Sequence, residues 1–256
     1  MPAERRVLLI GIGAGDPELI TLQAITALNS ADVFIIVDKA EDAADLRAAR
    51  QAVLDRFCTA RPHRVVAIAD AKRDPSMPYG EAVREWHHRR TVAIEEALTG
   101  AVTDGETVGV LVWGDPSLYD STIRIFDEIN SRDVVRADYS VIAGISSVQA
   151  LVASHRITLN RIGQPVLITT GRRLAEGIPD GVEDVVVMLD SGETFLRYRD
   201  QPYEIFWGAY LGSVDEVLVA GPIDQVADEI ISVRRAAKAR QGWIFDIYLM
   251  RRSATA

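Results

Sequence analysis

The sequence is poor in cysteine and histidine, with one cysteine, Cys58, and four histidines in 256 residues. A single cysteine excludes an intramolecular disulfide and any zinc or iron–sulfur site built from several cysteines of one chain, so we expect no metal site. Long apolar runs are also missing. The run before the first glycine, Val7–Ile10, is too short for a signal-peptide core or a membrane span. We therefore expect a cytoplasmic protein with no membrane partner.

Positive charge is scarce as well: the sequence has 28 Lys and Arg and 37 Asp and Glu, which give a formal net charge of -9. This balance argues against a broad phosphate-binding surface and hence against a nucleic-acid partner. Residues 38–90 are an exception, with eleven Lys or Arg, nine Asp or Glu and three of the four histidines. An anionic small molecule could bind there, although charged residues of this kind are more commonly solvated helix faces.

Buried strands and helices alternate along the first 150 or so residues. Val7–Gly11 is an apolar run that ends in glycine, which is typical of a strand buried on both faces of a parallel sheet. The alternation predicts an α/β fold with a doubly wound parallel sheet, whose ligands bind at the carboxyl ends of the strands. The expected strands are 7–11, 33–37, 65–69, 108–113 and 134–139, and the expected helices are 17–28, 42–57, 80–98, 117–130 and a short one after residue 144.

After residue 157 the pattern changes to shorter strands. They are expected at 166–170, 185–189, 203–207, 216–220 and 242–251, with a helix at 223–240 before the last strand. This change predicts two α/β domains, residues 1–157 and 158–256, the second with a mixed sheet. The cleft between two such domains is the expected place for a cofactor.

A glycine-rich turn, Gly11–Asp16 (GIGAGD), follows the first strand and opens a helix. It invites comparison with the dinucleotide-binding fingerprint, but Asp16 stands where that fingerprint has its third glycine. A carboxylate there satisfies the positive end of a helix, which a pyrophosphate would otherwise occupy. We therefore interpret Asp16 as a helix cap, and a purely structural tight turn stays an open alternative.

Two further strands end in similar turns. Gly114-Asp115-Pro116 follows the strand that ends at Trp113, and Ala143–Ser147 (AGISS) precedes a short helix. Asp115 could be an ordinary helix cap, yet Gly114 would let a ligand approach the backbone at the carboxyl end of a parallel strand. The third turn could likewise be only a serine-capped helix.

These three segments, in this order and spacing, resemble the signature motifs of the tetrapyrrole methylases, which read approximately GxGPGDxxLxT, GDP and PG[IV][ST][SA]. Both family prolines are replaced here, by Ala14 and Ala143, so the loops are where we expect a departure from the family. Within the family, residues 38–87 resemble a deacetylating carbon methylase of cobalamin biosynthesis. The resemblance runs essentially end to end and includes residues 207–212 (WGAYLG).

The resemblance implies a homodimeric enzyme that transfers a methyl group from S-adenosylmethionine to C-1 of precorrin-5, with loss of the C-20 acetyl group as acetate. Such a reaction asks mainly for alignment of donor and acceptor, and it needs no covalent nucleophile. Asp115 is the strongest single candidate, either as a hydrogen-bond acceptor for the cofactor or as a group that orients the methyl donor. The residues that the resemblance assigns to the cofactor are Ala14, Trp113, Gly114, Asp115, Leu118, Ser146, Ser147, Met188, Gly208 and Ala209.

Cationic side chains should line the substrate site, because tetrapyrroles of this class carry many carboxylates and guanidinium groups bind carboxylates in a bidentate manner. Arg172 and Arg173 are the most attractive, since they directly follow a strand end. Tyr79 and His87 are candidates for proton transfer during deacylation, although an isolated histidine on a helix commonly serves packing. The candidates for substrate binding are Gly15, Asp16, Lys39, Arg50, Arg73, Arg156, Arg172 and Arg173.

Three alternatives stay open. Loss of both family prolines would suit a ligand-sensing homologue without catalysis, against which the intact Asp115 and the Ser146-Ser147 pair count. The first glycine turn alone would suit a nicotinamide-dependent dehydrogenase. Another corrin-ring methylase of the same family is the nearest rival, and residues 38–87 are the feature that discriminates it.

Overall fold

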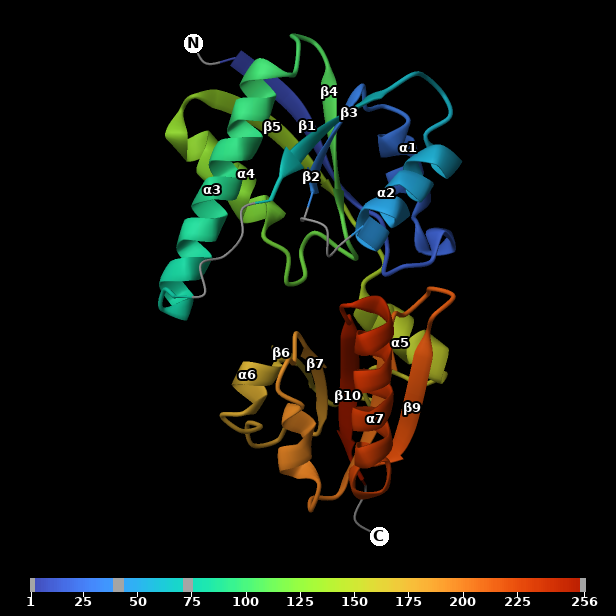
Figure 1. Ribbon diagram of the computed structural model, residues 1–256. Coiled ribbons are helices and arrows are strands. Elements are labelled where there is room, and N and C mark those ends of the chain that lie inside the picture. Colours follow the sequence, from blue (N-terminus) through green and yellow to red (C-terminus); the bar gives the residue numbers. More distant parts are fainter. Residues whose placement is uncertain (1–2, 39–43, 71–75, 254–256) are drawn as a thin grey trace. The chain divides into compact units, whose positions relative to one another are not determined.

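The computed structural model describes residues 3–38, 44–70 and 76–253, with the side chains of 38, 44–46 and 79 left out. The chain divides into two compact units, Met1–Ile145 and Ser146–Ala256 (Figure 1). Each unit has its own five-stranded sheet. Among the described residues, no helix is long and apolar enough to cross a membrane.

The sheet of the first unit is entirely parallel, with the strand order β3-β2-β4-β1-β5. This confirms the predicted doubly wound sheet. The connection after β1 leads toward β2 and β3, and the connection after β4 leads the opposite way to β5. The direction of the connections therefore reverses between the neighbouring strands β1 and β4. Ligands of doubly wound sheets bind at such a reversal. The strands are β1 (Ala3–Gly11), β2 (Val33–Asp38), β3 (Arg64–Ala69), β4 (Thr107–Val112) and β5 (Val135–Ile142).

Helices cover both faces of this sheet, α1 (Leu22–Leu28) and α2 (Ala44–Phe57) on one face and α3 (Tyr79–Gly100) and α4 (Thr122–Arg132) on the other (Figure 1). Successive strand residues point to opposite faces, so Leu9 joins the cluster of α3 and α4 while Ile10 joins that of α1 and α2. Both side chains are fully buried. The unbroken apolar run at the start of the chain is therefore explained by burial on two faces.

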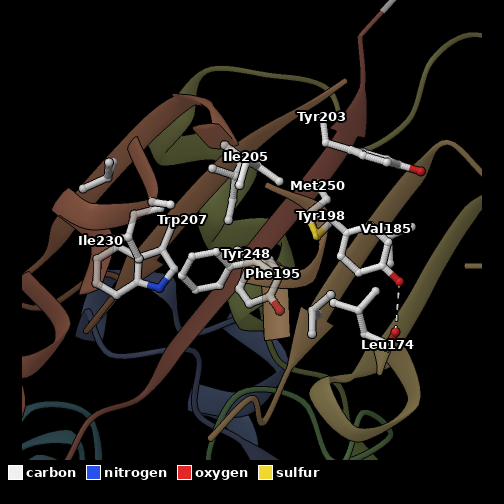
Figure 2. Close-up of a cluster of buried hydrophobic side chains, with 14 of the residues drawn as sticks. Leu174, Val185, Phe195, Tyr198, Tyr203, Ile205, Trp207, Ile230, Tyr248 and Met250 are labelled. Atoms are coloured by element: carbon white, nitrogen blue, oxygen red, sulfur yellow. Dashed lines mark hydrogen bonds between the residues drawn. The ribbon is translucent and has the colours of Figure 1, made fainter. Parts of the chain in front are cut away.

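The sheet of the second unit is mixed, as predicted, with the order β6-β7-β10-β8-β9 and only β6 and β7 parallel. One face packs under α7 (Ile223–Gln241), and Figure 2 shows its core, in which the rings of Phe195 and Tyr248 meet edge to face at 5.5 Å. The other face packs against α5 (Ser147–His155). The remaining elements are β6 (Val166–Thr170), α6 (Gly171–Leu174), β7 (Asp184–Met188), the 3-10 helix η3 (Thr194–Tyr198), β8 (Tyr203–Ala209), β9 (Val217–Pro222) and β10 (Asp246–Arg252).

Helix α5 belongs to the second unit, whereas the sequence places the domain boundary after residue 157. The reason is packing. Gly208 of β8 leaves room for the side chain of Leu151, whose Cδ1 lies 2.9 Å from where a Cβ at Gly208 would be. Because α5 packs on this sheet, the boundary between the two units lies between Ile145 and Ser146.

Several expected elements start or end elsewhere. The helix expected at 117–130 begins only at Thr122, because Tyr119 adopts a left-handed conformation (φ 51°) that no helix accommodates. The helix expected at 17–28 is divided into a 3-10 turn, η1 (Pro17–Leu19), and α1. The last strand begins at Asp246 and not at Gly242, which has φ 77° and ends α7. The short α6 and η3 were not predicted, since neither is long enough to show a helical period.

Replacing Gly109 of β4 by alanine should destabilise the first unit. A Cβ there would lie 2.5 Å from Cε1 of the fully buried Phe34 on the adjacent strand. Overpacking of this kind costs about 1–3 kcal/mol, so urea unfolding should shift to a lower midpoint. The matched control is Gly100→Ala at the end of α3, where nothing lies within 4 Å of the added carbon. Unchanged unfolding of Gly109→Ala would contradict this packing.

Candidate functional site

The loops after β1 and β4 are paired by their backbones at the reversal point of the first sheet. The Gly114 N–H donates to the Gly13 carbonyl at 2.8 Å, and the Gly13 N–H donates back to the Gly114 carbonyl at 3.3 Å. The Ile12 N–H continues the ladder to the Val112 carbonyl at 2.9 Å. Two of the three sequence motifs are therefore joined by an antiparallel bridge between glycines.

The third motif packs onto this bridge, and only glycines fit there. A Cβ on Gly144 would overlap the Gly114 carbonyl oxygen, and a Cβ on Gly11 would lie 2.6 Å from the Gly144 nitrogen. Gly13 and Gly114 also have positive φ angles, 85° and 69°, which glycine adopts without steric cost. The sequence suggested that Gly114 lets a ligand approach the backbone. In the structure, the group that approaches it is another loop of the same unit.

Asp115 ties the second motif to the third. One carboxylate oxygen accepts the Ser117 N–H at 2.8 Å and the Ser117 hydroxyl, and the other accepts the Gly144 N–H at 2.8 Å. Partial burial would raise the pKa of Asp115, but the hydrogen bonds from Ser117 and Gly144 outweigh it and hold the pKa below its ordinary value. Asp115 is thus a carboxylate at neutral pH. The oxygen that accepts the Gly144 N–H has a second lone pair for a ligand.

The other polar residues of the first motif act as caps. Asp16 accepts the Glu18 N–H at 2.8 Å at the start of η1, as expected from the sequence. Thr21 accepts the Ala24 N–H at 3.0 Å, and its hydroxyl donates to the Ala143 carbonyl at 3.4 Å. The first and third motifs are therefore in contact through Thr21 at one of the two positions where the family proline is missing.

The cofactor candidates of the first unit lie around this junction. Ala14 is buried in the loop after β1, and Gly15 follows it half-exposed. Trp113 is half-buried and packs against the cluster under α1 and α2. Leu118 is also half-exposed, and its N–H closes a turn with the Asp115 carbonyl at 3.2 Å. The structure thus brings the candidates of the first two motifs together.

The cofactor candidates of the second unit occupy strand and helix ends. Ser146 caps α5 by accepting the Val148 N–H at 3.2 Å, and Ser147 is the first residue of that helix. Met188 is the half-exposed last residue of β7. Gly208 and Ala209 are buried in β8, between β9 and β10, with side-chain space filled by the unit's own residues.

The described cationic candidates lie on three helices, one in the first unit and two in the second. Arg172 and Arg173 are exposed on α6, directly after β6, and Arg173 forms a 2.7 Å ion pair with Glu176. Arg50 is half-buried on α2. Arg156 ends α5 in a left-handed conformation (φ 57°). Two further candidates, Lys39 and Arg73, lie outside the described residues.

His87 lies on α3, close enough to Asp120, Arg124 and Glu128 for their charges to act on it. Partial burial lowers the pKa of His87, and the positive charges of Arg124 and Arg90 lower it further. The imidazole is therefore neutral near pH 7 and able to accept a proton. Tyr79 begins α3, but its side chain lies outside what the structure describes.

Sequence reasoning missed Asp190, a buried carboxylate two residues after the end of β7. It accepts hydrogen bonds from Gly192, Thr194 and Tyr248. A carboxylate two residues before a glycine at a strand end was the available signal. The described residues contain no group of three or more His, Cys, Asp or Glu side chains arranged to hold a metal ion.

A family model described as Tetrapyrrole (Corrin/Porphyrin) Methylases matches residues 6–227. A curated protein named Precorrin-6A synthase [deacetylating], from Sinorhizobium sp., is 46% identical over 251 residues, which are 98% of this chain and 96% of that protein. Both matches span the two units.

Solved structures agree with this. A cobalamin synthesis related protein (CobF) from Corynebacterium diphtheriae superposes with a TM-score of 0.83 at 35% identity, covering 97% of this chain and 98% of that one. Uroporphyrin-III C-methyl transferase from Thermus thermophilus, solved with S-adenosyl homocysteine, has a TM-score of 0.58 at 21% identity and covers 96% of this chain and 97% of that one. The second likeness is one of fold.

Asp115→Asn should destabilise the protein in a pH-dependent way. Charge-assisted hydrogen bonds contribute about 1.5–3 kcal/mol each to stability. The variant replaces the carboxylate that accepts from Ser117 and Gly144 by a neutral amide. Because the folded pKa of Asp115 lies below its ordinary value of 3.8, the stabilisation is complete above 3.8 and is lost as the pH falls through the lower folded value. Urea unfolding of parent and variant should differ most near neutral pH and converge in acid. A difference that grows in acid would contradict this.

Proposed function

The chain belongs to the tetrapyrrole (corrin/porphyrin) methylases, and we propose that it is an S-adenosylmethionine-dependent C-methyltransferase of cobalamin biosynthesis. It methylates precorrin-5 at C-1 and releases the C-20 acetyl group as acetate, which gives precorrin-6A. The observation that carries this proposal is the 46% identity to Precorrin-6A synthase [deacetylating] over 98% of the chain.

The residues around Asp115 suit this cofactor. S-adenosylmethionine supplies an activated methyl group on a sulfonium, together with an ammonium group. Asp115 is ionised at neutral pH and keeps a lone pair on Oδ2 for an ammonium donor, and the half-exposed Trp113 and Leu118 offer apolar surface next to it. Alignment of the reacting atoms can supply on the order of 7–11 kcal/mol of the barrier at most, so a rigid loop junction is the feature that such chemistry needs.

The remaining cofactor residues are proposed from the resemblance. Ala14 and Gly114 offer backbone close to Asp115, and the other members lie in the second unit. They are Ser146, Ser147, Met188, Gly208 and Ala209. The two serines lie at the start of α5, Met188 ends β7, and the other two residues lie in β8. Their assignment to the cofactor comes from the resemblance alone.

Substrate recognition is proposed for the cations, because precorrin carboxylates require positive partners. Arg172 and Arg173 are exposed on one short helix and can bind carboxylates. The other candidates are Gly15, Asp16, Lys39, Arg50, Arg73 and Arg156.

Deacetylation requires water to add to the acetyl carbonyl, after which the bond from that carbon to C-20 breaks, its electron pair stays with the macrocycle, which takes a proton at C-20, and acetate leaves. A general base assists by taking the proton of the water. His87 is proposed for this role because its depressed pKa leaves the imidazole neutral at pH 7. Tyr79, at the start of the same helix, is the second candidate.

The enzyme is further proposed to be a cytoplasmic homodimer without nucleic-acid or membrane partners. The dimer rests on the resemblance to the family. The net charge of -9 supports the absence of a nucleic-acid partner, since phosphate backbones attract basic surfaces.

Anaerobic incubation with precorrin-5 and methyl-labelled S-adenosylmethionine tests the reaction. We expect label in the macrocycle and one acetate released per methyl group, both followed by mass spectrometry. Label without acetate would move the protein to another methylation step of the family. If neither product formed although S-adenosylhomocysteine bound, the precorrin-5 assignment would be wrong.

Removing Arg172 and Arg173 together should weaken substrate binding. Hydrogen bonds to charged groups contribute about 1.5–3 kcal/mol, so the KM for precorrin-5 should rise at least tenfold, while the KM for S-adenosylmethionine stays within about twofold. The control is Arg235→Ala, which removes an exposed arginine from α7. An unchanged KM for precorrin-5 in the double variant would remove this pair from the substrate site.

A further inference from the structure

Helix α3 is much longer than the strand that precedes it. It has 22 residues, whereas β3 has six, so the helix spans about 33 Å and the strand about 20 Å. Asp70 directly follows β3, and its carboxylate binds Arg90 of α3. Arg90 therefore marks the level at which the strand ends. The part of α3 before Arg90 extends about 16 Å farther, and Figure 1 shows the helix running past the end of β3.

This projecting part, residues 79–89, stands at the carboxyl edge of the sheet. All strands of the sheet are parallel, so the loop that carries Asp115 leaves β4 at the same edge. The charges of Asp120 and Arg124, which follow this loop, act on His87. The projecting part of α3 is therefore close to the chain that continues from the Asp115 loop, at the edge where doubly wound sheets bind ligands.

Trp86, in the projecting part, is held in place by an ion pair. Arg90 donates to both oxygens of Asp70, at 2.7 and 2.9 Å, and the two side chains are only 15% and 7% exposed. The Arg90 guanidinium lies over the Trp86 ring, 4.2 Å from its centroid. A two-point contact of this kind fixes the plane of the guanidinium, and with it the indole that stacks on that plane.

The ion pair contributes orientation more than stability. Taking two charges out of water is costly, and apolar residues in such positions often give equal or greater stability. Trp86 and Arg90 are four residues apart, so they share the side of α3 that meets the end of β3. Glu95 lies on the opposite side and pairs with Arg132 of α4 at 2.9 Å. The pair therefore holds Trp86 about 6 Å beyond the strand end, on the β3 side of the helix.

The indole is suited to a ligand with a planar face. Trp86 is half-exposed, and its ring centroid lies 5.0 Å from that of His87, the candidate base. A rigid indole offers an apolar surface on which conjugated rings stack with little loss of side-chain freedom. The conjugated segments of a tetrapyrrole have such a face. Contact with Trp86 would also bring the macrocycle next to His87.

We propose that Trp86 packs against the macrocycle of the precorrin substrate and that Arg90 and Asp70 are the positioning residues that orient it. This inference rests on the proposed function, because it takes the substrate to be a tetrapyrrole. Trp86 supplies the contact, and the ion pair acts only through Trp86.

Trp86→Ala tests the contact. Loss of the indole should raise the KM for precorrin-5 about tenfold or more, while kcat stays within about twofold, because the contact exists before and during the reaction. Binding of S-adenosylhomocysteine, measured by calorimetry, should match the parent and shows that the variant is folded. Trp86→Phe keeps an aromatic face and should recover most of the lost KM.

The matched control is Phe57→Ala. Phe57 is also half-buried under an arginine, with the Arg56 guanidinium 5.0 Å from its ring centroid. It ends α2, directly before β3 begins, so it lies at the amino edge of the sheet and away from the ligand edge. The KM for precorrin-5 should therefore stay within about twofold of the parent value.

Asp70→Asn tests the positioning role. The variant removes the negative charge that fixes Arg90, so it should raise the KM for precorrin-5 in the parent background. In the Trp86→Ala background it should have little further effect on this KM. An equal rise in both backgrounds would mean that Asp70 does not act through Trp86. A purely structural pair would lower the unfolding midpoint and leave the KM unchanged.

Each result decides the proposal. If the parent converts precorrin-5 and Trp86→Ala has the parent KM, the contact is wrong while the proposed function stands. A raised KM with equally weakened S-adenosylhomocysteine binding would overturn the assignment too, because the substitution would then act on the cofactor. Should Trp86→Ala fail to fold, Trp86→Leu decides in the same way, since it fills the space beside Arg90 without a ring. If the parent bound S-adenosylhomocysteine but did not convert precorrin-5, the proposed function would fall and the inference with it.

Discussion

The loops after β1, β4 and β5 are held together by backbone contacts between glycines, and the candidate site of the first unit depends on this junction. The Gly13–Gly114 bridge lies where the direction of the strand connections reverses, and Gly144 packs against it with no room for a side chain. The hydrogen bond from Gly144 to Asp115 then fixes the position of the carboxylate. The three sequence motifs are thus parts of a single structural feature.

The two units use different chemistry for the same task of fixing strand ends. In the first unit, glycines allow loops to touch directly, and a partly exposed carboxylate completes the contact. In the second unit, the buried carboxylate of Asp190 gathers four donors and leaves Leu189 on the outside. A methyl transfer that gains mainly from alignment profits from rigid elements of this kind.

Much of the fold could be predicted from the sequence because burial on two faces leaves apolar runs that are easy to read, as at Val7–Gly11 and Val33–Val37. Local exceptions could not be read in this way. The late start of α4 depends on the turn at Tyr119, and the placement of α5 depends on Leu151 filling the space above Gly208. The left-handed Leu189 goes against its own backbone preference, so only the tertiary hydrogen bonds of Asp190 explain it. The motifs indicated the candidate site of the first unit, but not that its loops contact one another.

The most direct test of the preformed junction is hydrogen exchange of the Gly114 and Gly144 amides, measured by NMR with and without S-adenosylhomocysteine. Both amides donate hydrogen bonds inside the unit, to the Gly13 carbonyl and the Asp115 carboxylate. We expect both to be protected in the ligand-free protein, with little gain when ligand is added. Rapid exchange that slows only on binding would contradict the account, because the ligand would then assemble the junction.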